Sequence, residues 1–502
     1  MPFITIFYFT LQKKELTTSL KDTAISGAKW NGAFHIGKYL ITFFLSIILA
    51  RLLTPDEFGL LGMLTIITVI AQVFIDSGLS VAIIRLKEVK EVDYSTVFFF
   101  NIIISTTFYA MIFFIAPFVS NFYNEPQLTD LTRIISLVFL INALGLVQNA
   151  ILVRNLNFKK QSLCNITGVF ISAIIAAIMA IKGFGVYSIV GQAITQASIT
   201  NILLWVTSKW RPQLIFSCVS FKKLWSFGSK VLGVNIVTQI VDNIDNLIIG
   251  KVFSATQLGF YMRAKSSKQM PEQIFTNILN TTVFPVLTKV SDDDSEFRRL
   301  HLQFFKLSCF LFLPIVLGFA AVAESFTVVL FTEKWLISVP ILQIIVLGSF
   351  PYFLGALFMQ TIMAKGKGQL YFKLNTAKKV LTLISIPFAI FFGVYPFIIS
   401  LTIISFINLF LDFWHTGKML NIPFSFYIKL ILPSFVLSVI MATIVFLIKF
   451  LPIDYPIITF GLQLIIGVLT YAIFATLQKN EEYYYILSII KEQINRIRHT
   501  FQ

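Results

Sequence analysis

Long apolar runs recur along this chain and constrain its fold more than any other feature. Runs long enough to cross a bilayer core of roughly 30 Å follow one another from Trp30 to Gln478, separated by short polar clusters. Only 13% of the 502 residues are charged, against roughly 25% in a soluble domain. Since no soluble core could bury that much apolar surface, the sequence predicts an all-α polytopic membrane protein with about fourteen transmembrane helices.

A membrane β-barrel is excluded by the pattern inside these runs. Barrel strands alternate apolar and polar residues over segments of about ten residues. Residues 97–104 are Val-Phe-Phe-Phe-Asn-Ile-Ile-Ile, which does not alternate. The spans are therefore predicted to be helices.

A polar turn at residues 50–61 is repeated two hundred positions later, at residues 250–261. Each copy closes one apolar run and opens another. A small residue, a cation, two apolar residues, a hydroxyl residue and a glycine fall in register, the glycines being Gly59 and Gly259. Self-similarity at a fixed spacing indicates duplication, so we predict two equivalent six-helix bundles.

The repeat divides the chain into six predicted segments. Two helices after the second bundle have no counterpart in the first, and the tail has apolar residues near helical spacing with cations between them. The segments are a cytoplasmic N-terminal segment (1–29), the N-lobe (30–207), a cytoplasmic, polar and basic connector (208–224), the C-lobe (225–415), the extra helices (416–477) and a cytoplasmic amphipathic tail (478–502).

The individual spans follow from composition. They are Trp30–Ala50, Phe58–Ile84, Thr96–Val119, Leu131–Val153, Ser162–Ile181, Val186–Val206, Trp225–Ile249, Leu258–Leu287, Leu300–Ala323, Leu336–Met363, Phe372–Phe392, Tyr395–Trp414, Tyr427–Phe450 and Ile457–Leu477.

Cations collect in alternate loops, and this bias predicts the orientation. Arg154, Lys159 and Lys160 share one loop, whereas the loops on the opposite side hold one cation each at most. By the positive-inside rule both termini are predicted to be cytoplasmic. The same rule accounts for the net charge of +16 without a nucleic-acid partner. Three unpaired cysteines and four dispersed histidines indicate no disulfide framework, metal site or cofactor.

A charge at the bilayer centre costs roughly 2.5–3.5 kcal/mol, so cations inside predicted spans are candidates for a functional site. Five of them stand out by position. Lys38 lies in the first span and Lys230 holds the equivalent place in the seventh. Arg263, Lys265 and Lys268 open the eighth span within six residues of one another. We predict that these five residues line a cationic, substrate-binding cavity.

Acidic residues accompany these cations. Tyr261, Lys265, Lys268 and Glu272 recur at helical spacing and form one polar stripe, which Pro271 should kink. By position alone, four acids are candidates for ion coupling, namely Asp76, Asp242, Asp245 and Glu272.

Structural explanations for these charges remain open. Lys268 and Glu272 could simply pair at i,i+4, and the aspartates could cap helices or pair with a neighbouring cation. The lysines of the first and seventh spans could snorkel to the inner surface, and snorkelling is the favoured explanation for Lys306, Lys378 and Lys379. A cavity wall explains the cluster of three cations better. A net cationic cavity favours an anionic ligand such as a phosphate or pyrophosphate.

Motifs of enzymes are weak in this chain. The Asp-x-Asp at residues 292–294 resembles a metal–nucleotide-sugar motif, but it lies in a short loop without an α/β domain, which favours a solvated loop. No Gly-rich phosphate loop of the Walker type occurs. The external loops are too short for a glycan polymerase, so we do not predict an enzyme.

Several stretches together resemble a known family. They are LARLLTPDEFG at residues 49–59, DSGL at 76–79, DNIDNLIIG at 242–250 and LGFY at 258–261. These residues are similar to the polysaccharide-exporting flippases of the multidrug/oligosaccharidyl-lipid/polysaccharide superfamily, most of all to the O-antigen, teichuronic-acid and colanic-acid exporters. The resemblance covers nearly the whole chain.

The resemblance implies alternating access between two six-helix lobes in a bacterial plasma membrane. The implied substrate is an undecaprenyl-pyrophosphate-linked oligosaccharide, moved from the inner to the outer leaflet for cell-surface polysaccharide synthesis. Its implied partners are this lipid-linked oligosaccharide and membrane lipids, with other membrane proteins of polysaccharide assembly as candidates. Two alternatives remain, a multidrug cation antiporter of the same superfamily and a membrane-embedded glycan polymerase or transferase.

Overall fold

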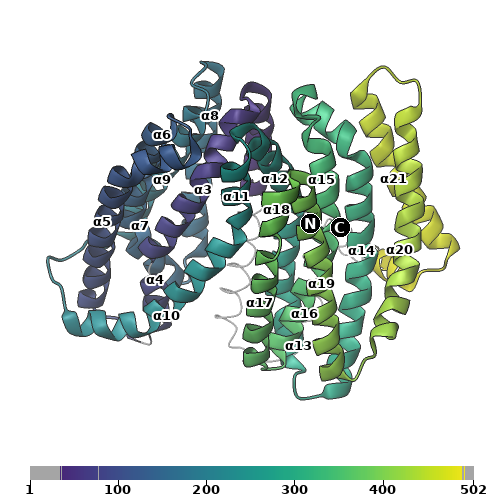
Figure 1. The fold of residues 1–502 in the computed structure, drawn as a ribbon. Helices are drawn as coiled ribbons and strands as arrows, with labels where there is room; N and C mark the ends of the chain where they lie inside the picture. The colour runs from purple at the N-terminus through teal and green to yellow at the C-terminus, as the bar shows by residue number, and fades with distance from the viewer. Residues whose placement is uncertain (1–33, 35–36, 77, 87, 489–490, 492–502) are drawn as a thin grey trace, which may run out of the picture. The chain divides into compact units, whose positions relative to one another are not determined.

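The computed structural model describes residues 34, 37–76, 78–86, 88–488 and 491 (Figure 1). Within these ranges the regular structure is helical and contains no strand, which confirms the predicted all-α class. The predicted N-terminal segment and most of the predicted tail lie outside the described residues. The described chain divides into two compact units at Met262 and Arg263, which we call the N-unit and the C-unit. The lobe boundaries drawn from the sequence stay predictions.

The N-unit is a bundle of helices in which α7 packs against α5 and α9, and α9 packs against α8. Residues 37–52 form its first described helix. The others are α3 (Pro55–Asp76), α4 (Leu79–Arg85), α5 (Glu91–Tyr123), α6 (Leu128–Ile135), α7 (Leu137–Arg154), α8 (Phe158–Ile181), α9 (Tyr187–Ser208), α10 (Cys218–Asp242), α11 (Ile244–Val252) and the start of α12 (Ala255–Ile278).

The C-unit is built around the long helix α14, which packs against α15, α16, α20 and α21. Beyond the rest of α12, its helices are the π-helix η2 (Leu279–Val283), α13 (Phe284–Lys289), α14 (Asp294–Phe331), η3 (Glu333–Trp335), α15 (Ser338–Leu347), α16 (Ser349–Ala364), α17 (Gly368–Leu383), α18 (Ile386–Phe392), α19 (Val394–Leu420), α20 (Phe424–Leu447), η4 (Ile448–Phe450) and α21 (Pro456–Leu477).

Eleven helical segments of the described chain are long and apolar enough to cross a membrane. Each corresponds to one predicted span, and most are longer than predicted because polar residues extend the helices beyond the apolar window. The first predicted span begins outside the described residues. The seventh is broken at Asn243 between α10 and α11, and the eighth corresponds to α12, which is too polar to qualify. The count of fourteen therefore stays a prediction.

The repeated turns have the same local structure. In both copies a helix ends two residues before a hydroxyl residue outside the helix, Thr54 or Ser254, and the next helix begins immediately after it. The first copy is closed by Glu57, whose Oε2 accepts from the backbone N–H of Thr54 at 2.7 Å, as in a capping box. In the second copy the Ser254 hydroxyl accepts from the N–H of Gln257 at 3.2 Å. The predicted duplication is thus confirmed at this turn.

The two turns also pack against each other within the N-unit. A Cβ placed on Gly59 would lie 1.8 Å from the carbonyl oxygen of Ala255, and a Cβ on Gly259 would lie 1.8 Å from that of Pro55. The Thr256 hydroxyl donates a hydrogen bond to the Asp56 carboxylate across the same contact. The contact is therefore reciprocal, and only glycine allows backbones to approach so closely. We call it the glycine crossing.

Two cations of the N-unit satisfy carbonyl groups at α5 that would otherwise lack a partner. Pro117 has no N–H to bond to the carbonyl of Phe113, and Arg133 Nε donates to that oxygen at 3.3 Å. Lys251 Nζ donates to the carbonyl of Phe122 at the C-terminal end of α5, at 2.5 Å. Lys251 therefore has a structural contact at the end of a helix.

The Asp-x-Asp motif lies at the start of α14, where it caps the helix. The Asp293 carboxylate accepts from the backbone N–H groups of Ser295 and Glu296 at 2.9 and 3.0 Å. A hydrogen bond from the Ser295 hydroxyl and these backbone bonds lower the pKa of Asp293 below its ordinary value. Helix capping therefore gives Asp293, the middle residue of the motif, a structural role.

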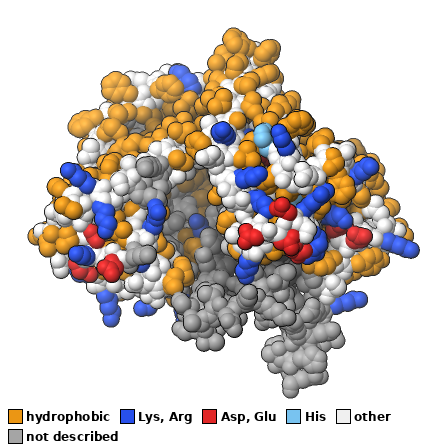
Figure 2. Space-filling view, turned by 90° about the horizontal axis from the view of Figure 1, so that it is seen from below, with side chains coloured by type: hydrophobic (Ala, Val, Ile, Leu, Met, Phe, Trp, Pro, Cys, Tyr) orange, Lys and Arg blue, Asp and Glu red, His pale blue; other side chains and the backbone are white. Residues whose placement is uncertain are grey.

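The described part of the C-terminal tail is helical over residues 481–488 and packs against the C-unit. Tyr483 and Ile486 contact the cluster formed by Phe310, Leu437 and Ala475. A pocket of about 490 Å³ opens beside it, between α14, α20 and the tail. In this pocket Lys306, predicted to snorkel, forms ion pairs with Glu481 at 3.3 Å and Glu482 at 3.8 Å. Figure 2 shows many Lys and Arg side chains on the face seen from below.

Candidate functional site

Helix α12 is the most polar of the long helices that the structure describes. Its C-unit portion carries Arg263, Lys265, Lys268 and Glu272, the cluster that the sequence singled out. The helix continues through Pro271 and is followed directly by the π-helix η2. Prolines and π-turns disturb the regular backbone ladder and often mark functional segments of a helix.

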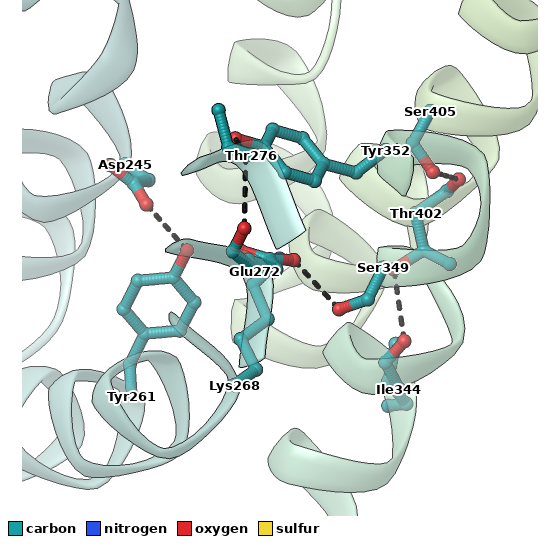
Figure 3. Close-up of polar contacts among 10 residues, drawn as sticks. All are labelled: Asp245, Tyr261, Lys268, Glu272, Thr276, Ile344, Ser349, Tyr352, Thr402 and Ser405. Carbon is teal, nitrogen blue, oxygen red and sulfur yellow. Dashed lines mark hydrogen bonds and ion pairs between the residues drawn. The ribbon is translucent and has the colours of Figure 1, made fainter. Parts of the chain in front are cut away.

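Lys268 and Glu272 form an ion pair on one face of α12 (Figure 3). The distance from Lys268 Nζ to Glu272 Oε1 is 3.1 Å, and the Lys268 side chain is 23% exposed. Glu272 is buried, and the hydroxyl of Ser349 donates to its Oε1 at 2.7 Å. The predicted i,i+4 alternative is thus present, with a third polar partner from α16.

Ser349 owes its position to a break between two helices. Helix α15 ends at Leu347, and α16 begins at Ser349 after Gly348. The break lies against α19, where the hydroxyl of Thr402 donates to the carbonyl of Ile344 at 3.2 Å (Figure 3). In a membrane, broken helices persist where polar groups satisfy the freed backbone, and they often border binding sites.

The polar group extends one turn further along α12. The Thr276 hydroxyl donates to the backbone carbonyl of Glu272 at 2.9 Å and lies 3.3 Å from the hydroxyl of Tyr352 on α16. Glu272, Ser349, Thr276 and Tyr352 therefore link α12 to α16 through side-chain oxygens. We call these four residues, together with Lys268, the α12–α16 cluster.

Arg263 lies away from this cluster, as its place off the predicted stripe implied. Its guanidinium carbon is 3.6 Å from the centroid of the Phe331 ring at the end of α14. Arg263 is buried, and a guanidinium stacked on an aromatic face in an apolar setting is stabilised by a cation–π interaction. Lys265, between the two, is partly buried.

In the N-unit, the break between α10 and α11 gathers polar residues of the DNIDN stretch. Asp242 is the last residue of α10 and is exposed, while Asn243 donates from its amide to the carbonyl of Gln239 at 3.0 Å. Asp245 is buried and accepts from the hydroxyl of Tyr261 at 2.5 Å. Tyr261, predicted to extend the stripe of α12, is thus held at this break.

The structure shows fewer contacts for the remaining predicted site residues. Lys38 is exposed on the first described helix, Lys230 belongs to α10, and Asp76 is the last residue of α3. The side chains of Lys230 and Asp76 lie outside the described part of the structure. Because these residues belong to the N-unit and the α12 cations to the C-unit, the convergence of all five cations on one cavity stays a prediction.

A buried ion pair in the C-unit was not predicted from the sequence. Lys378 on α17 lies 2.5 Å from both carboxylate oxygens of Asp412 on α19. The Asp412 side chain is 1% exposed and that of Lys378 is 15% exposed, so Lys378 pairs in the interior instead of snorkelling. Asp412 interrupts an otherwise apolar run, which was the available signal; its partner, 34 residues away, could not be read from spacing.

A second buried polar group centres on His301. Its Nδ1 and Nε2 lie 3.0 Å from the hydroxyls of Thr361 and Tyr427. Phe305 and Phe358 pack beside the ring, which is fully buried. Among the described residues no group of three or more His, Cys, Asp or Glu could hold a metal ion.

Two solved structures define the class of fold. The lipid II flippase MurJ, in an inward closed conformation, matches with a TM-score of 0.74 at 19% identity, covering 89% of this chain and 98% of that chain. An inward-facing multidrug resistance MATE family transporter matches with a TM-score of 0.58 at 12% identity, covering 76% of this chain and 94% of that chain. The chain therefore has the fold of a polytopic membrane transporter.

Sequence comparisons then identify the family. Residues 48–340, more than half of the chain, match the family described as Polysaccharide biosynthesis protein. The chain belongs to this family, which confirms the resemblance seen in the sequence. Two relatives are the Teichuronic acid biosynthesis protein TuaB of Bacillus subtilis (28% identical, covering 85% of this chain and 89% of the relative) and the Lipopolysaccharide biosynthesis protein WzxC of Escherichia coli (26%, 72% and 74%).

Proposed function

We propose that this protein is a flippase for an undecaprenyl-pyrophosphate-linked oligosaccharide. It carries this substrate from the inner to the outer leaflet of a bacterial plasma membrane by alternating access, for cell-surface polysaccharide synthesis. Both termini face the cytoplasm in this proposal, and the protein moves its substrate without changing covalent bonds. The names of its relatives and the flippase among its structural neighbours support this proposal.

The observation that carries the proposal is the charged helix α12 in a chain of this family. Three cations and one acid on a helix of a largely apolar protein give the helix a net positive charge. A pyrophosphate and acidic sugars are attracted by such a helix. The hydroxyls of the α12–α16 cluster supply further hydrogen-bond partners of the kind that sugars need when they leave water.

The ion pair of the α12–α16 cluster suits a site that must both bind and release an anionic substrate. Lys268 can exchange the Glu272 carboxylate for a substrate phosphate, since both are oxyanions. Ser349 continues to satisfy Glu272 during such an exchange, because its hydroxyl donates independently of the lysine. We assign Lys265 and Lys268 to direct contact with the substrate anion, with Arg263, Lys38 and Lys230 as supporting cations.

Replacing Lys265 and Lys268 together by alanine is expected to reduce outer-leaflet delivery to the background of empty vesicles. Hydrogen bonds to charged groups contribute about 1.5–3 kcal/mol each, so losing two should weaken substrate binding by at least about tenfold per contact. The measurement uses purified protein in vesicles, a labelled lipid-linked oligosaccharide and a reagent that reaches the outer leaflet only.

A matched control removes two exposed lysines elsewhere in the C-unit. Lys418→Ala with Lys429→Ala changes the net charge equally and should leave delivery intact. Normal delivery by the Lys265/Lys268 variant, with the protein inserted and monodisperse, would contradict the site assignment.

Two other functions are separated by the same preparation. A multidrug cation antiporter would move organic cations and would prefer an acidic pocket, which the net positive charge of α12 disfavours. A glycan polymerase or transferase would change the length or linkage of the labelled glycan. Recovery of an unchanged glycan in the opposite leaflet supports the flippase, and a lengthened or transferred glycan supports the enzyme.

A further inference from the structure

The connector between α9 and α10 carries an exposed apolar patch. Leu214 is 93% exposed, Ile215 and Phe216 are 44% and 48% exposed, and Val219 at the start of α10 is 79% exposed. We name these four residues the connector patch. The connector was predicted to be polar and basic, but it also contains three consecutive large apolar residues. In the part of the chain that the structure describes, they belong to no packed helix.

The backbone on both sides of this patch is tied to the start of α5. The N–H of Gln213 donates to the hydroxyl of Ser95, and the N–H of Ser217 donates to that of Thr96, each at 3.1 Å. Before them, Trp210 donates from its ring nitrogen to Glu91 at 2.7 Å. These bonds fix the connector at both ends, so the patch between them is displayed outward and is not free to fold back.

The first half of α10 continues the same surface. Its inner face packs on α5, where the Phe221 ring lies 4.8 Å from that of Phe100 and Leu224 is buried. Among the described residues α10 is not one of the helices long and apolar enough to cross a membrane, and Leu232–Asp242 is a shorter apolar segment. Figure 1 shows the earlier part of α10 running across the lower end of α5. This part is therefore amphipathic and lies along a surface.

Four cations flank the patch, and Glu91 of α5 is an acid that contacts the connector, at Trp210. Lys209, Arg211, Lys222 and Lys223 are all exposed, and residues 208–223 contain neither Asp nor Glu. Large apolar side chains beside Lys and Arg, at the end of a membrane helix, are typical of segments that lie in the headgroup layer. Each such cation contributes about 1 kcal/mol of attraction to an anionic leaflet.

We propose that residues 209–223 form an interfacial anchor whose ligand is the anionic phospholipid surface of the cytoplasmic leaflet. The connector patch inserts just below the headgroups, and the four cations bind lipid phosphates. An acidic protein surface is the alternative occupant, but the patch directly follows membrane helix α9, which places it next to the lipid. The anchor is independent of which substrate the protein carries.

The test uses the full-length protein labelled at Cys218 with an environment-sensitive fluorophore. Cys218 adjoins the patch and is exposed, whereas Cys164 and Cys309 are buried, so labelling is selective. The protein is reconstituted in vesicles of phosphatidylcholine, with or without phosphatidylglycerol. We expect a blue-shifted emission and quenching by nitroxide-labelled lipids, both stronger with phosphatidylglycerol, and weak quenching by iodide in the water.

Variants separate the two contributions. Leu214→Ser, Ile215→Ser and Phe216→Ser combined should lose the lipid quenching, and Lys222→Gln with Lys223→Gln should lose only its dependence on phosphatidylglycerol. Lys418→Gln with Lys429→Gln, the matched control, should change neither.

Wild-type protein alone decides the proposal, whatever the stability of the variants. Strong iodide quenching without lipid quenching would place the patch in water and overturn the anchor. Protection from both quenchers would overturn it in favour of a covering protein surface.

Discussion

Alanine at Gly59 is expected to abolish transport and to lower the stability of the protein, because the new Cβ would lie 1.8 Å from the carbonyl oxygen of Ala255. Real Cβ atoms essentially never approach another atom within 3.0 Å, so the two helix starts must separate. Overpacking costs about 1–3 kcal/mol, and backbone contacts lie at the upper end because no rotamer can relieve them. Gly259→Ala should behave in the same way, since the crossing is reciprocal.

A graded series of glycines tests this expectation within one unit. At Gly62 the new Cβ would meet the Leu258 side chain at 2.8 Å, which can move, so Gly62→Ala should cost less. At Gly233 nothing lies within 4 Å, so Gly233→Ala serves as the control. The measurements are the thermal unfolding midpoint in detergent and leaflet delivery in vesicles.

The double variant distinguishes a crossing from two separate contacts. Once Gly59→Ala has separated the helices, Gly259→Ala should add little, so the combined loss of stability should be smaller than the sum. Equal behaviour of Gly59→Ala and Gly233→Ala, or strict additivity of the pair, would refute the crossing as a packed unit.

Alanine at Asp412 is expected to cost about 3–5 kcal/mol, because it leaves the Lys378 ammonium buried without its partner. Replacing both residues by apolar ones, Lys378→Met with Asp412→Leu, should restore most of the stability, since removing a buried pair together avoids the uncompensated charge. Gly355 on α16 packs against Asp412, and a Cβ at Gly355 would lie 2.9 Å from Asp412 Oδ2. A third helix therefore packs closely against the ion pair.

An exposed pair provides the control for this prediction. Lys449 and Glu324 lie 3.4 Å apart with side chains 30% and 54% exposed, and removing such a pair costs about 0–1 kcal/mol. The free energy of unfolding in detergent is measured for the Asp412 and the Glu324 variants. A similar small loss at Asp412 and at Glu324 would contradict the buried ion pair. If the double variant is stable but delivers no substrate, the pair also acts in transport.

The sequence predicted what depends on local chemistry. Apolar runs located the spans because a lipid-facing helix needs about 20 apolar residues. The repeated turns predicted equivalent starts at Phe58 and Leu258, and the helices begin at Pro55 and Ala255, because polar capping residues precede the apolar window. The seventh and eighth spans were less regular than predicted. The break at Asn243 and the polarity of α12 both reduce the apolar length on which that prediction rested.

The contacts of the candidate site join residues that are far apart in the sequence, so sequence spacing could not predict them. The i,i+4 pair of Lys268 with Glu272 was foreseen as an alternative, but its third partner, Ser349, lies 77 residues away. The glycine crossing joins segments two hundred residues apart, so the repeat showed the two glycines but not that they touch. The connector patch was not predicted because the four cations of that segment indicated a polar loop.

The polarity of α12 also bears on how the chain enters the membrane during synthesis. Lys268 and Glu272 pair within the helix, but two further partners of its charged residues are synthesised later, since Phe331 belongs to α14 and Ser349 to α16. A helix with this many charges pays a penalty of about 2.5–3.5 kcal/mol for each one that reaches the hydrocarbon centre alone. We therefore expect stable insertion of α12 to depend on later helices, so that the helices of the C-unit enter the membrane cooperatively.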